Sequence, residues 1–476
     1  MPETHYDAIV IGSGAGGSAV AYQLVRNGKT VLLLEKGDRL PRDGSTLDVK
    51  QVFKEGKFKN KKTWVDNRNR VFVPDEFYNV GGKTKWYGAA LLRFGRDEFQ
   101  ADEAHQCLAW PIDYDVLAPY YDQAERLLHV NTFDNELELQ ALIDKITNAD
   151  PAWRAEPLPL GLKREILNDP AEAKHFDGFA SACGYKSDAE WNLLYPIENE
   201  PNFQLLRNKE VSSLSHTTES PSQINGVHCT DGSHYTADTV ILAAGAMSSP
   251  RILQDYLEQT GLNDRLLSAP MVGAFFKFHI NSALVAFSPF ENQDVLRKTT
   301  IFFNDAFPHS NVQCLGWIDG DILATQLPAA VPKFVAKAAG KRAYGFFVTT
   351  EDGSSEDNRI LSCGGHGGIP VMDYELDRIP ASIQEHRASV RAFEARLLKT
   401  GLLGVSKYTG IAGTAHALGS LVMGNDPRRS VVDPSGKVHD MEGLYVADGS
   451  VLPRSSRVNP ALTIYAWGLR LGDHLK

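Results

Sequence analysis

Three glycines near the N-terminus, Gly12, Gly14 and Gly17, have the GxGxxG spacing of a dinucleotide-binding turn. The first glycine allows a tight turn, the second lets the backbone approach a pyrophosphate, and the third lets a helix pack closely on a strand. Amide groups at the start of that helix then bind phosphate oxygens. Glu35 follows about 20 residues later, where an acid binds ribose hydroxyls. This spacing predicts an adenosine cofactor with a free 2′-hydroxyl, FAD or NAD rather than NADP.

These residues need a strand, a turn, a helix and a second strand to hold them, and the flanking sequence predicts each one. Residues 8–11 are continuously apolar, as in a strand buried on both faces of a parallel sheet. Residues 18–27 predict a helix that ends at Gly28, and residues 30–34 predict the second buried strand. Further β segments are expected at 203–206, Val211 and 239–242, and the last leads into Ala244 and Gly245.

Composition excludes several other classes of protein. The chain has 476 residues, enough for about two to four domains, and 43% of them are hydrophobic, enough for an extensive core. Its 59 acidic and 49 basic residues give a net charge of −10, which argues against nucleic acid as the main partner. The five scattered cysteines argue against a disulfide framework or a zinc module, and no run of about 18 apolar residues predicts a membrane span. Because the first residues lack a basic leader, we expect a cytoplasmic enzyme.

Five segments occur in the order of one family's motifs. They are Asn79–Thr84, Gly245–Leu253, His416–Gly424, Leu444–Ser450 and Asn459–Ile464. They resemble the signatures of the glucose–methanol–choline (GMC) oxidoreductases, FAD enzymes whose first motif reads HxxGTxRMG. Trp110–Ile112, with Tyr120 and Tyr121, is similar to the branch that oxidises sugars, including pyranose oxidases and gluconate or glucose dehydrogenases.

The resemblance implies an α/β fold with a Rossmann-like FAD-binding domain and a discontinuous α+β substrate domain. The FAD-binding domain is expected over 1–130, 200–272 and 405–476, and the substrate domain over 131–199 and 273–404. Apolar residues at helical spacing predict a helix over 379–398. Strands of an antiparallel sheet are expected at 274–287, 312–317, 344–350 and 360–363.

His416 and Asn459 are the candidate catalytic pair. Oxidation of an alcohol needs a base for the hydroxyl proton and a fixed donor for the developing alkoxide. Histidine titrates in a useful range, and a carboxamide stays neutral. The resemblance implies that His416 accepts the proton, that Asn459 orients the substrate oxygen, and that flavin N5 receives the hydride. A helix beginning at Pro460 would direct its positive end toward the flavin.

The dinucleotide motif and the resemblance together assign residues to the cofactor. These are Gly12, Ser13, Gly14, Gly17, Glu35, Lys36, Gly81, Gly82, Thr84, Gly88, Val211, Ala244, Gly245, Asp448, Gly449, Pro460, Ala461 and Leu462. Asp448 either lies near the ribityl and phosphate groups or caps a helix. In some sugar oxidases of the family a histidine at the position of Trp86 carries a covalent flavin link, so Trp86 predicts non-covalent FAD.

The sequence departs from the family motif at two positions, because Val422 replaces its arginine and Ser420 its threonine. Residues 351–352, followed by Asn358 and Arg359, are similar to a family segment that contacts the active site, or form a solvated turn. The expected substrate is a small alcohol, most simply a sugar or glycoside, and the expected electron acceptor is oxygen or another molecule. Two alternatives are a GMC enzyme acting on a non-sugar alcohol and a catalytically silent flavin-binding protein.

Overall fold

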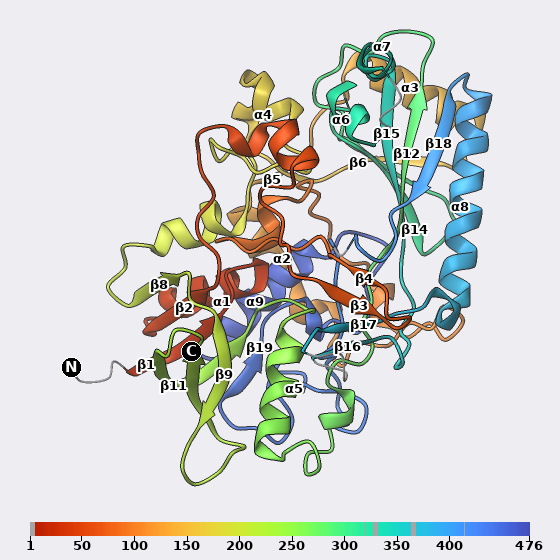
Figure 1. Cartoon of the computed structure of the whole chain (residues 1–476). Coiled ribbons are helices and arrows are strands. Elements are labelled where there is room, and N and C mark those ends of the chain that lie inside the picture. Colours follow the sequence, from red (N-terminus) through yellow and green to blue (C-terminus); the bar gives the residue numbers. More distant parts are fainter. Residues whose placement is uncertain (1–4, 319, 327–331, 363–367, 414) are drawn as a thin grey trace.

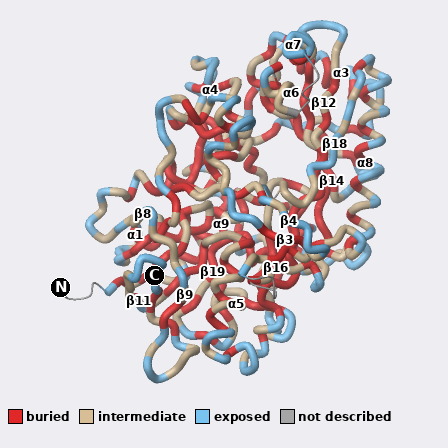
Figure 2. The backbone as a smooth tube through the Cα atoms, viewed as in Figure 1, coloured by how far each residue is buried: buried red, intermediate tan, exposed pale blue. Residues whose placement is uncertain are grey.

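The computed structural model describes residues 5–318, 320–326, 332–362, 368–413 and 415–476. Two large sheets organise the chain, one at the lower left of Figure 1 and the other at its upper right. Buried residues follow both sheets and the helices beside them (Figure 2). The predicted α/β fold, in which a Rossmann-like sheet is combined with a separate antiparallel sheet, is confirmed.

The seven-stranded sheet contains the predicted dinucleotide-binding unit. Its order is β8–β2–β1–β11–β10–β9, and β19 also pairs with β11. β8, β2, β1, β11 and β19 are parallel, whereas β10 and β9 are antiparallel additions. The strands are β1 (His5–Ile11), β2 (Val31–Glu35), β8 (Phe203–Arg207), β9 (Val211–His216), β10 (Ile224–Cys229), β11 (His234–Leu242) and β19 (Leu444–Val446).

Two helices pack together beside the parallel strands. α1 (Ala15–Arg26) begins earlier than predicted, and α9 (Ala461–His474) begins after Pro460 rather than at it. The two helices approach closely where their residues are small, since a Cβ on Gly468 would lie 2.6 Å from the carbonyl oxygen of Gly16. This contact fixes α9 against α1, and it thereby fixes the segment that leads into α9.

The six-stranded sheet is antiparallel, in the order β18–β12–β15–β14–β13–β6. α8 (Pro380–Lys399), which confirms the helix predicted over 379–398, packs against it together with α3 (Leu137–Ala149). The buried side chains of Phe393 and Ile143 belong to this contact. The strands are β6 (Arg154–Pro157), β12 (Ile280–Phe287), β13 (Thr300–Phe303), β14 (Ser310–Cys314), β15 (Ala343–Thr350) and β18 (Leu403–Tyr408).

Three predicted strands are wrong in part. The strand expected at 312–317 ends at Cys314, the last residue of β14. Residues 274–279 precede β12 because their backbone bonds go to other segments, including Asn358 and Leu418. The run at 360–363 contributes to a separate four-stranded sheet, and Cys363 lies outside the described residues. That sheet has the order β16–β17–β3–β4, with β16 (Arg359–Leu361), β17 (Val371–Asp373), β3 (Trp64–Asp66) and β4 (Val71–Phe72).

The remaining helices and short strands lie outside the three sheets described above. β18 crosses the predicted domain boundary at 404–405, since residues 405–408 pair with β12. The other helices and strands are α2 (Tyr114–Leu127), α4 (Pro170–Lys174), α5 (Ser249–Thr260), α6 (Gly320–Gln326), α7 (Lys333–Gly340), β5 (Val130–Asn131) and β7 (Leu160–Gly161).

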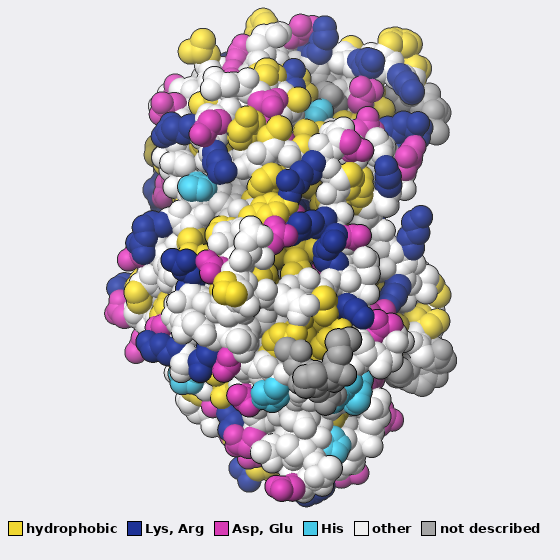
Figure 3. Space-filling model, turned by 90° about the vertical axis from the view of Figure 1, so that its left-hand side faces the viewer, with side chains coloured by type: hydrophobic (Ala, Val, Ile, Leu, Met, Phe, Trp, Pro, Cys, Tyr) yellow, Lys and Arg dark blue, Asp and Glu magenta, His cyan; other side chains and the backbone are white. Residues whose placement is uncertain are grey.

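The surface carries charges of both signs. On the face shown in Figure 3, acidic and basic side chains are interspersed, and hydrophobic side chains gather in a band down the centre. In the described part of the chain, no helix has both the length and the apolar character needed to cross a membrane. Cys107, Cys183, Cys229 and Cys314 are free thiols.

Candidate active site

The glycine turn after β1 combines crowded and open positions. Gly12 has a φ of +104°, and a Cβ on it would lie 2.5 Å from the carbonyl oxygen of Ala243. A Cβ on Gly17 would lie 2.0 Å from the oxygen of Gly12, so close packing of strand and helix requires glycine at both positions. At Gly14, by contrast, a Cβ would meet nothing within 4 Å. Gly14 therefore leaves open backbone beside the start of α1, as approach of a pyrophosphate requires.

Glu35 ties the end of β2 to this turn. Its Oε2 accepts hydrogen bonds from the backbone and hydroxyl of Ser13 at 3.1 and 2.6 Å, and its Oε1 accepts one from the amide of Gly37 at 2.8 Å. The hydroxyl of Ser13 in turn accepts a hydrogen bond from the amide of Gly81 at 3.1 Å. Glu35 therefore positions two loops relative to each other, in addition to the contact with ribose that the sequence predicts.

The second glycine turn lies directly on the first. A Cβ on Gly82 would lie 3.2 Å from the Cα of Gly14, and Gly81 and Gly82 both have positive φ angles. The hydroxyl of Thr84 donates to the carbonyl oxygen of Gly81 at 2.6 Å, which closes the turn. The sequence motifs at 12–17 and 81–84 are thus one structural unit.

Asp448 joins the loop after β19 to the loop after β11. Its Oδ2 accepts hydrogen bonds from the amide of Gly245 at 2.8 Å and the hydroxyl of Ser249 at 2.5 Å. Its Oδ1 accepts one from the amide of Ser450 at 2.8 Å, so the side chain caps the short 3-10 helix over Gly449–Val451. Burial raises the pKa of Asp448. The structure therefore shows the helix-cap role, in a residue that also shapes the loop at Gly245.

Other predicted cofactor residues have contacts of their own. The amine of Lys36 lies 3.2 Å from the centre of the Tyr78 ring, and burial lowers the pKa of Lys36 to about 8. A Cβ on Gly88 would lie 2.2 Å from a carboxylate oxygen of Asp177, so Gly88 packs against the ion pair of Asp177 and Lys298 rather than against the glycine turn.

Two further predicted residues lie on the seven-stranded sheet. Val211 begins β9 at the outer edge of the sheet. The backbone amide of Ala244 donates to the hydroxyl of Ser249.

The loops at the carboxyl end of the seven-stranded sheet fit a dinucleotide such as FAD. The loops after β1, β11 and β19 all follow the carboxyl ends of parallel strands, where open α/β sheets bind their ligands. At Gly245, as at Gly14, a Cβ would meet nothing within 4 Å, so the backbone of both loops is open to a ligand. Residues 12–17 at the start of α1 would hold the pyrophosphate.

His416 lies half-buried in the loop that follows β18. Its Nδ1 lies 2.7 Å from Nδ1 of His279, and Nε2 of His279 lies 2.7 Å from the carbonyl oxygen of Ser456. Burial lowers the pKa of His416 well below its usual value, and the charges of His279, Lys83 and Lys298 lower it further. His416 is therefore a neutral imidazole at neutral pH, as a general base must be.

Asn459 lies in the segment that leads from Ser456 into α9. Gln313 of β14 donates a hydrogen bond to its Oδ1. Its amide nitrogen donates to no other described residue, so both N–H groups remain available. The contacts from His416 through His279 to Ser456 therefore link the candidate base to the segment that carries Asn459, although the two side chains come from separate loops.

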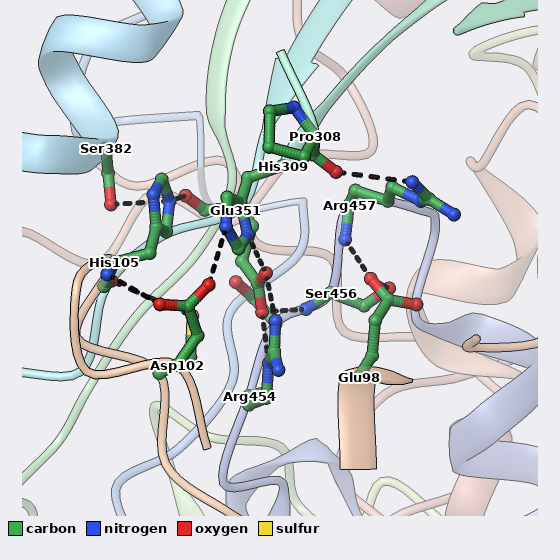
Figure 4. Close-up of polar contacts among 12 residues, drawn as sticks. Glu98, Asp102, His105, Pro308, His309, Glu351, Ser382, Arg454, Ser456 and Arg457 are labelled. Carbon is green, nitrogen blue, oxygen red and sulfur yellow. Dashed lines mark hydrogen bonds and ion pairs between the residues drawn. The ribbon is translucent and has the colours of Figure 1, made fainter. Parts of the chain in front are cut away.

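A buried charge network holds the same segment (Figure 4). Glu351 is 0% exposed and accepts hydrogen bonds from Nε and Nη2 of Arg454 at 2.8 and 2.7 Å, and from the amide of Ser456 at 3.0 Å. Burial alone would raise the pKa of Glu351, but hydrogen bonds from Arg454 and His309 outweigh burial and hold it well below its usual range. The carboxylate is therefore ionised and fixes the backbone at Ser456.

His309 lies between two carboxylates of this network. Its Nδ1 is 2.8 Å from Glu351, and its Nε2 is 3.1 Å from Asp102. Ligand atoms within 4.8 Å of one another, as a metal ion would need, occur in the groups His105, His309, Glu385 and Cys107, His309, Glu351. Both nitrogens of His309 are bonded to carboxylates, and Arg454 binds Glu351 through two hydrogen bonds.

His309 should make stability fall as the pH rises above neutrality. Burial alone would lower the pKa of His309, but its bonds to Glu351 and the charges of Glu385 and Asp102 raise it. A raised histidine pKa contributes stability that is fully present below the unfolded pKa of about 6.5 and is lost as the pH rises through the folded value. As the pH rises above about 6.5, Tm should therefore fall more steeply for the wild type than for His309→Gln. Parallel profiles would contradict an imidazolium at this position.

His279 and Gln313 contact the candidate catalytic pair but are not predicted from the sequence. Both residues lie in or beside apolar runs that are typical of the core of a sheet. A polar side chain in such a run could have indicated them, because a buried polar group needs a hydrogen-bond partner. The alternative of a solvated turn at 351–352 is wrong, since Glu351 and Asp352 are 0% and 1% exposed. Val422, in place of the motif arginine, lies in the hydrophobic core.

Comparisons with known proteins identify the family of the chain. Residues 7–271 match the family model described as FAD dependent oxidoreductase, and residues 377–468 match the model described as GMC oxidoreductase. The chain therefore belongs to the FAD-dependent oxidoreductases and, through its C-terminal region, to the GMC oxidoreductases. The prediction of an enzyme of this family that acts on CH–OH groups is confirmed.

Individual relatives match along nearly the whole chain. Paromamine 6'-oxidase from Streptomyces fradiae is 27% identical over 98% of this chain and 90% of its own length. The fructose dehydrogenase large subunit from Gluconobacter japonicus is 23% identical over 98% of this chain and 97% of its own length. A variant of formate oxidase from Aspergillus oryzae RIB40 has the same fold, with a TM-score of 0.73 at 16% identity over 100% of this chain and 99% of that one.

Proposed function

We propose that the enzyme oxidises an alcohol group of a sugar, amino sugar or glycoside to a carbonyl group, using non-covalently bound FAD. His416 is the base and Asn459 orients the substrate oxygen. The observation that carries the proposal is the chain of contacts from His416 through His279 to Ser456, which joins a neutral imidazole to the segment presenting Asn459. A catalytically silent flavin protein would not need this arrangement.

The relatives support the substrate class, since the names of two of them specify an aminoglycoside and a sugar. Trp86 supports non-covalent attachment. Its indole Nε1 donates to Asn79 at 3.0 Å, and its rings pack against Phe77 and Phe58. A buried indole held in this way offers no nucleophile at the position where some family members carry the flavin link.

The roles of the two side chains follow from their contacts. Neutral His416 accepts the proton of the substrate hydroxyl, and an N–H of Asn459 donates to the oxygen as negative charge develops on it. Gln313 holds the Oδ1 of Asn459, so the amide nitrogen remains the donor. The start of α9 favours negative charge in the same region. FAD, when bound, accepts the hydride.

Anaerobic mixing of the holoenzyme with a panel of alcohols tests the proposal. The panel contains paromamine, hexoses, alkyl glycosides, short diols and long-chain alcohols, and loss of the oxidised flavin absorbance is followed by stopped flow. We expect the sugars and amino sugars to reduce the enzyme with the highest kcat/KM. If only diols or long-chain alcohols reduce the flavin, the proposed sugar substrate is wrong. If no alcohol reduces it, the protein is a catalytically silent flavin-binding protein. Acid precipitation of the same preparation should release the yellow colour into the supernatant.

A further inference from the structure

His279 is buried directly behind the proposed base. The side chain is 1% exposed, and it lies immediately before β12, the strand at which the antiparallel sheet approaches the C-terminal loops. Its ring meets that of His416 edge to face, with the ring centres 4.8 Å apart. Both of its nitrogens make hydrogen bonds of 2.7 Å, one with His416 and one with the carbonyl oxygen of Ser456. These two bonds determine where the hydrogens of both rings lie.

The direction of each bond follows from the chemistry of its partners. A carbonyl oxygen only accepts, so Nε2 of His279 carries a hydrogen. Burial lowers the pKa of His279 to about 4, so at neutral pH the ring is neutral and its Nδ1 is an acceptor. Nδ1 of His416 must then be the donor of the bond between the rings. Neutral His416 consequently has its lone pair on Nε2, which bonds to nothing in the described ranges of the chain.

We propose that His279 is a positioning residue that holds His416 in the tautomer whose Nε2 is the free base. This inference rests on the proposed function, in which His416 takes the proton of the substrate. In that step the O–H bond of the alcohol breaks and an N–H bond forms at Nε2 of His416, while the carbon gives its hydride to FAD. The bond from Nδ1 of His416 to His279 is the same before and after, so no nearby group has to rearrange as the proton moves.

Ser456 fixes the other end of this arrangement. Its φ is +68°, in the left-handed region, and two buried carboxylates hold it there. Its amide donates to Glu351 at 3.0 Å and its hydroxyl to Glu98 at 2.6 Å (Figure 4). The carbonyl that determines the tautomer of His279 is therefore itself held by the charge network, which explains why a network of this kind lies beside the active-site segment.

Two variants of His279 separate positioning from simple packing. His279→Leu keeps an apolar side chain of moderate size but removes the acceptor, whereas His279→Asn keeps an oxygen that accepts from Nδ1 of His416. We expect His279→Leu to slow anaerobic flavin reduction by ~10- to 10⁴-fold, the upper figure being the loss seen when the partner that sets the tautomer of a protease histidine is changed. His279→Asn should recover much of the rate. The KM for the alcohol should change little in either variant, because neither removes a group that contacts substrate.

The tautomer itself is read from ¹⁵N spectra of histidine-labelled holoenzyme, with the His416 signals identified by their loss in His416→Ala. We expect a protonated Nδ1 and an unprotonated Nε2 in the wild type. The reverse tautomer would overturn the inference, as would a wild-type reduction rate in folded His279→Leu. If no alcohol reduces the wild type, the proposed function fails, but the ¹⁵N spectrum still decides the tautomer. The same spectrum decides it if His279→Leu does not fold.

Discussion

Replacing His416 with alanine should slow reduction of the holoenzyme by its alcohol substrate by about 10²- to 10⁴-fold, the usual contribution of a general base. In the wild type, burial and the charges of Lys83 and Lys298 keep the pKa of His416 low, so the imidazole is ready to accept a proton at neutral pH. Alanine removes the acceptor without touching the glycine turns. FAD content and the flavin spectrum should therefore remain those of the wild type.

The measurement is the limiting rate of anaerobic flavin reduction at saturating substrate. His474→Ala is a matched control, because His474 is an exposed histidine in the last turn of α9 and should react at the wild-type rate. Equal rates of flavin reduction in His416→Ala and His474→Ala would show that His416 is not the base. Loss of FAD from His416→Ala would instead show that His416 supports the cofactor site, which its contacts do not indicate.

Local motifs explain why the cofactor-binding end of the molecule could be predicted from the sequence. The glycine turn after β1 is determined by crowding between neighbouring segments, as at Gly12 and Gly17, so the spacing of the glycines carries the geometry. The apolar runs that form β1 and β2 are long enough to be recognised as strands without knowledge of the strands that pair with them. Glu35 was also recognisable, but its bonds to Ser13 and Gly37 could be seen only once the loops were in place.

The surroundings of His416 and Asn459 could not be predicted in the same way. His279 and Gln313 lie far from both residues in the sequence, and they reach them only because the antiparallel sheet meets the C-terminal loops. A histidine or a glutamine in the sequence does not show which residue its side chain will bond to. Glu351 lies in a family-like segment of the sequence, yet its burial as a carboxylate depends on the guanidinium of Arg454, which comes from a distant part of the chain. Long-range pairing of polar groups is set by tertiary contacts, which no local pattern encodes.

Replacing Glu351 with alanine should destabilise the protein by about 3–5 kcal/mol, the usual cost of removing one partner of a buried ion pair. The carboxylate is 0% exposed and binds Arg454 through two hydrogen bonds. Without it, a guanidinium that is 4% exposed has lost its counter-charge, and the amide of Ser456 has lost its acceptor. The loss is measured as the shift of the urea denaturation curve of the holoprotein.

Two comparisons show whether the cost comes from the stranded charge. Asp115→Ala breaks an ion pair with Arg96 in which both side chains are largely exposed, at 70% and 66%, and it should shift the urea denaturation curve little, because solvent screens an exposed pair. The double variant Glu351→Met with Arg454→Met removes both charges while filling the space, and it should recover much of the loss, because a buried pair replaced by apolar side chains of similar size is often neutral. If Glu351→Ala matched Asp115→Ala, the ion pair would not be the element that fixes the backbone at Ser456. If the double variant were as unstable as Glu351→Ala, the lost hydrogen bond to Ser456, rather than the uncompensated charge of Arg454, would be the main cause.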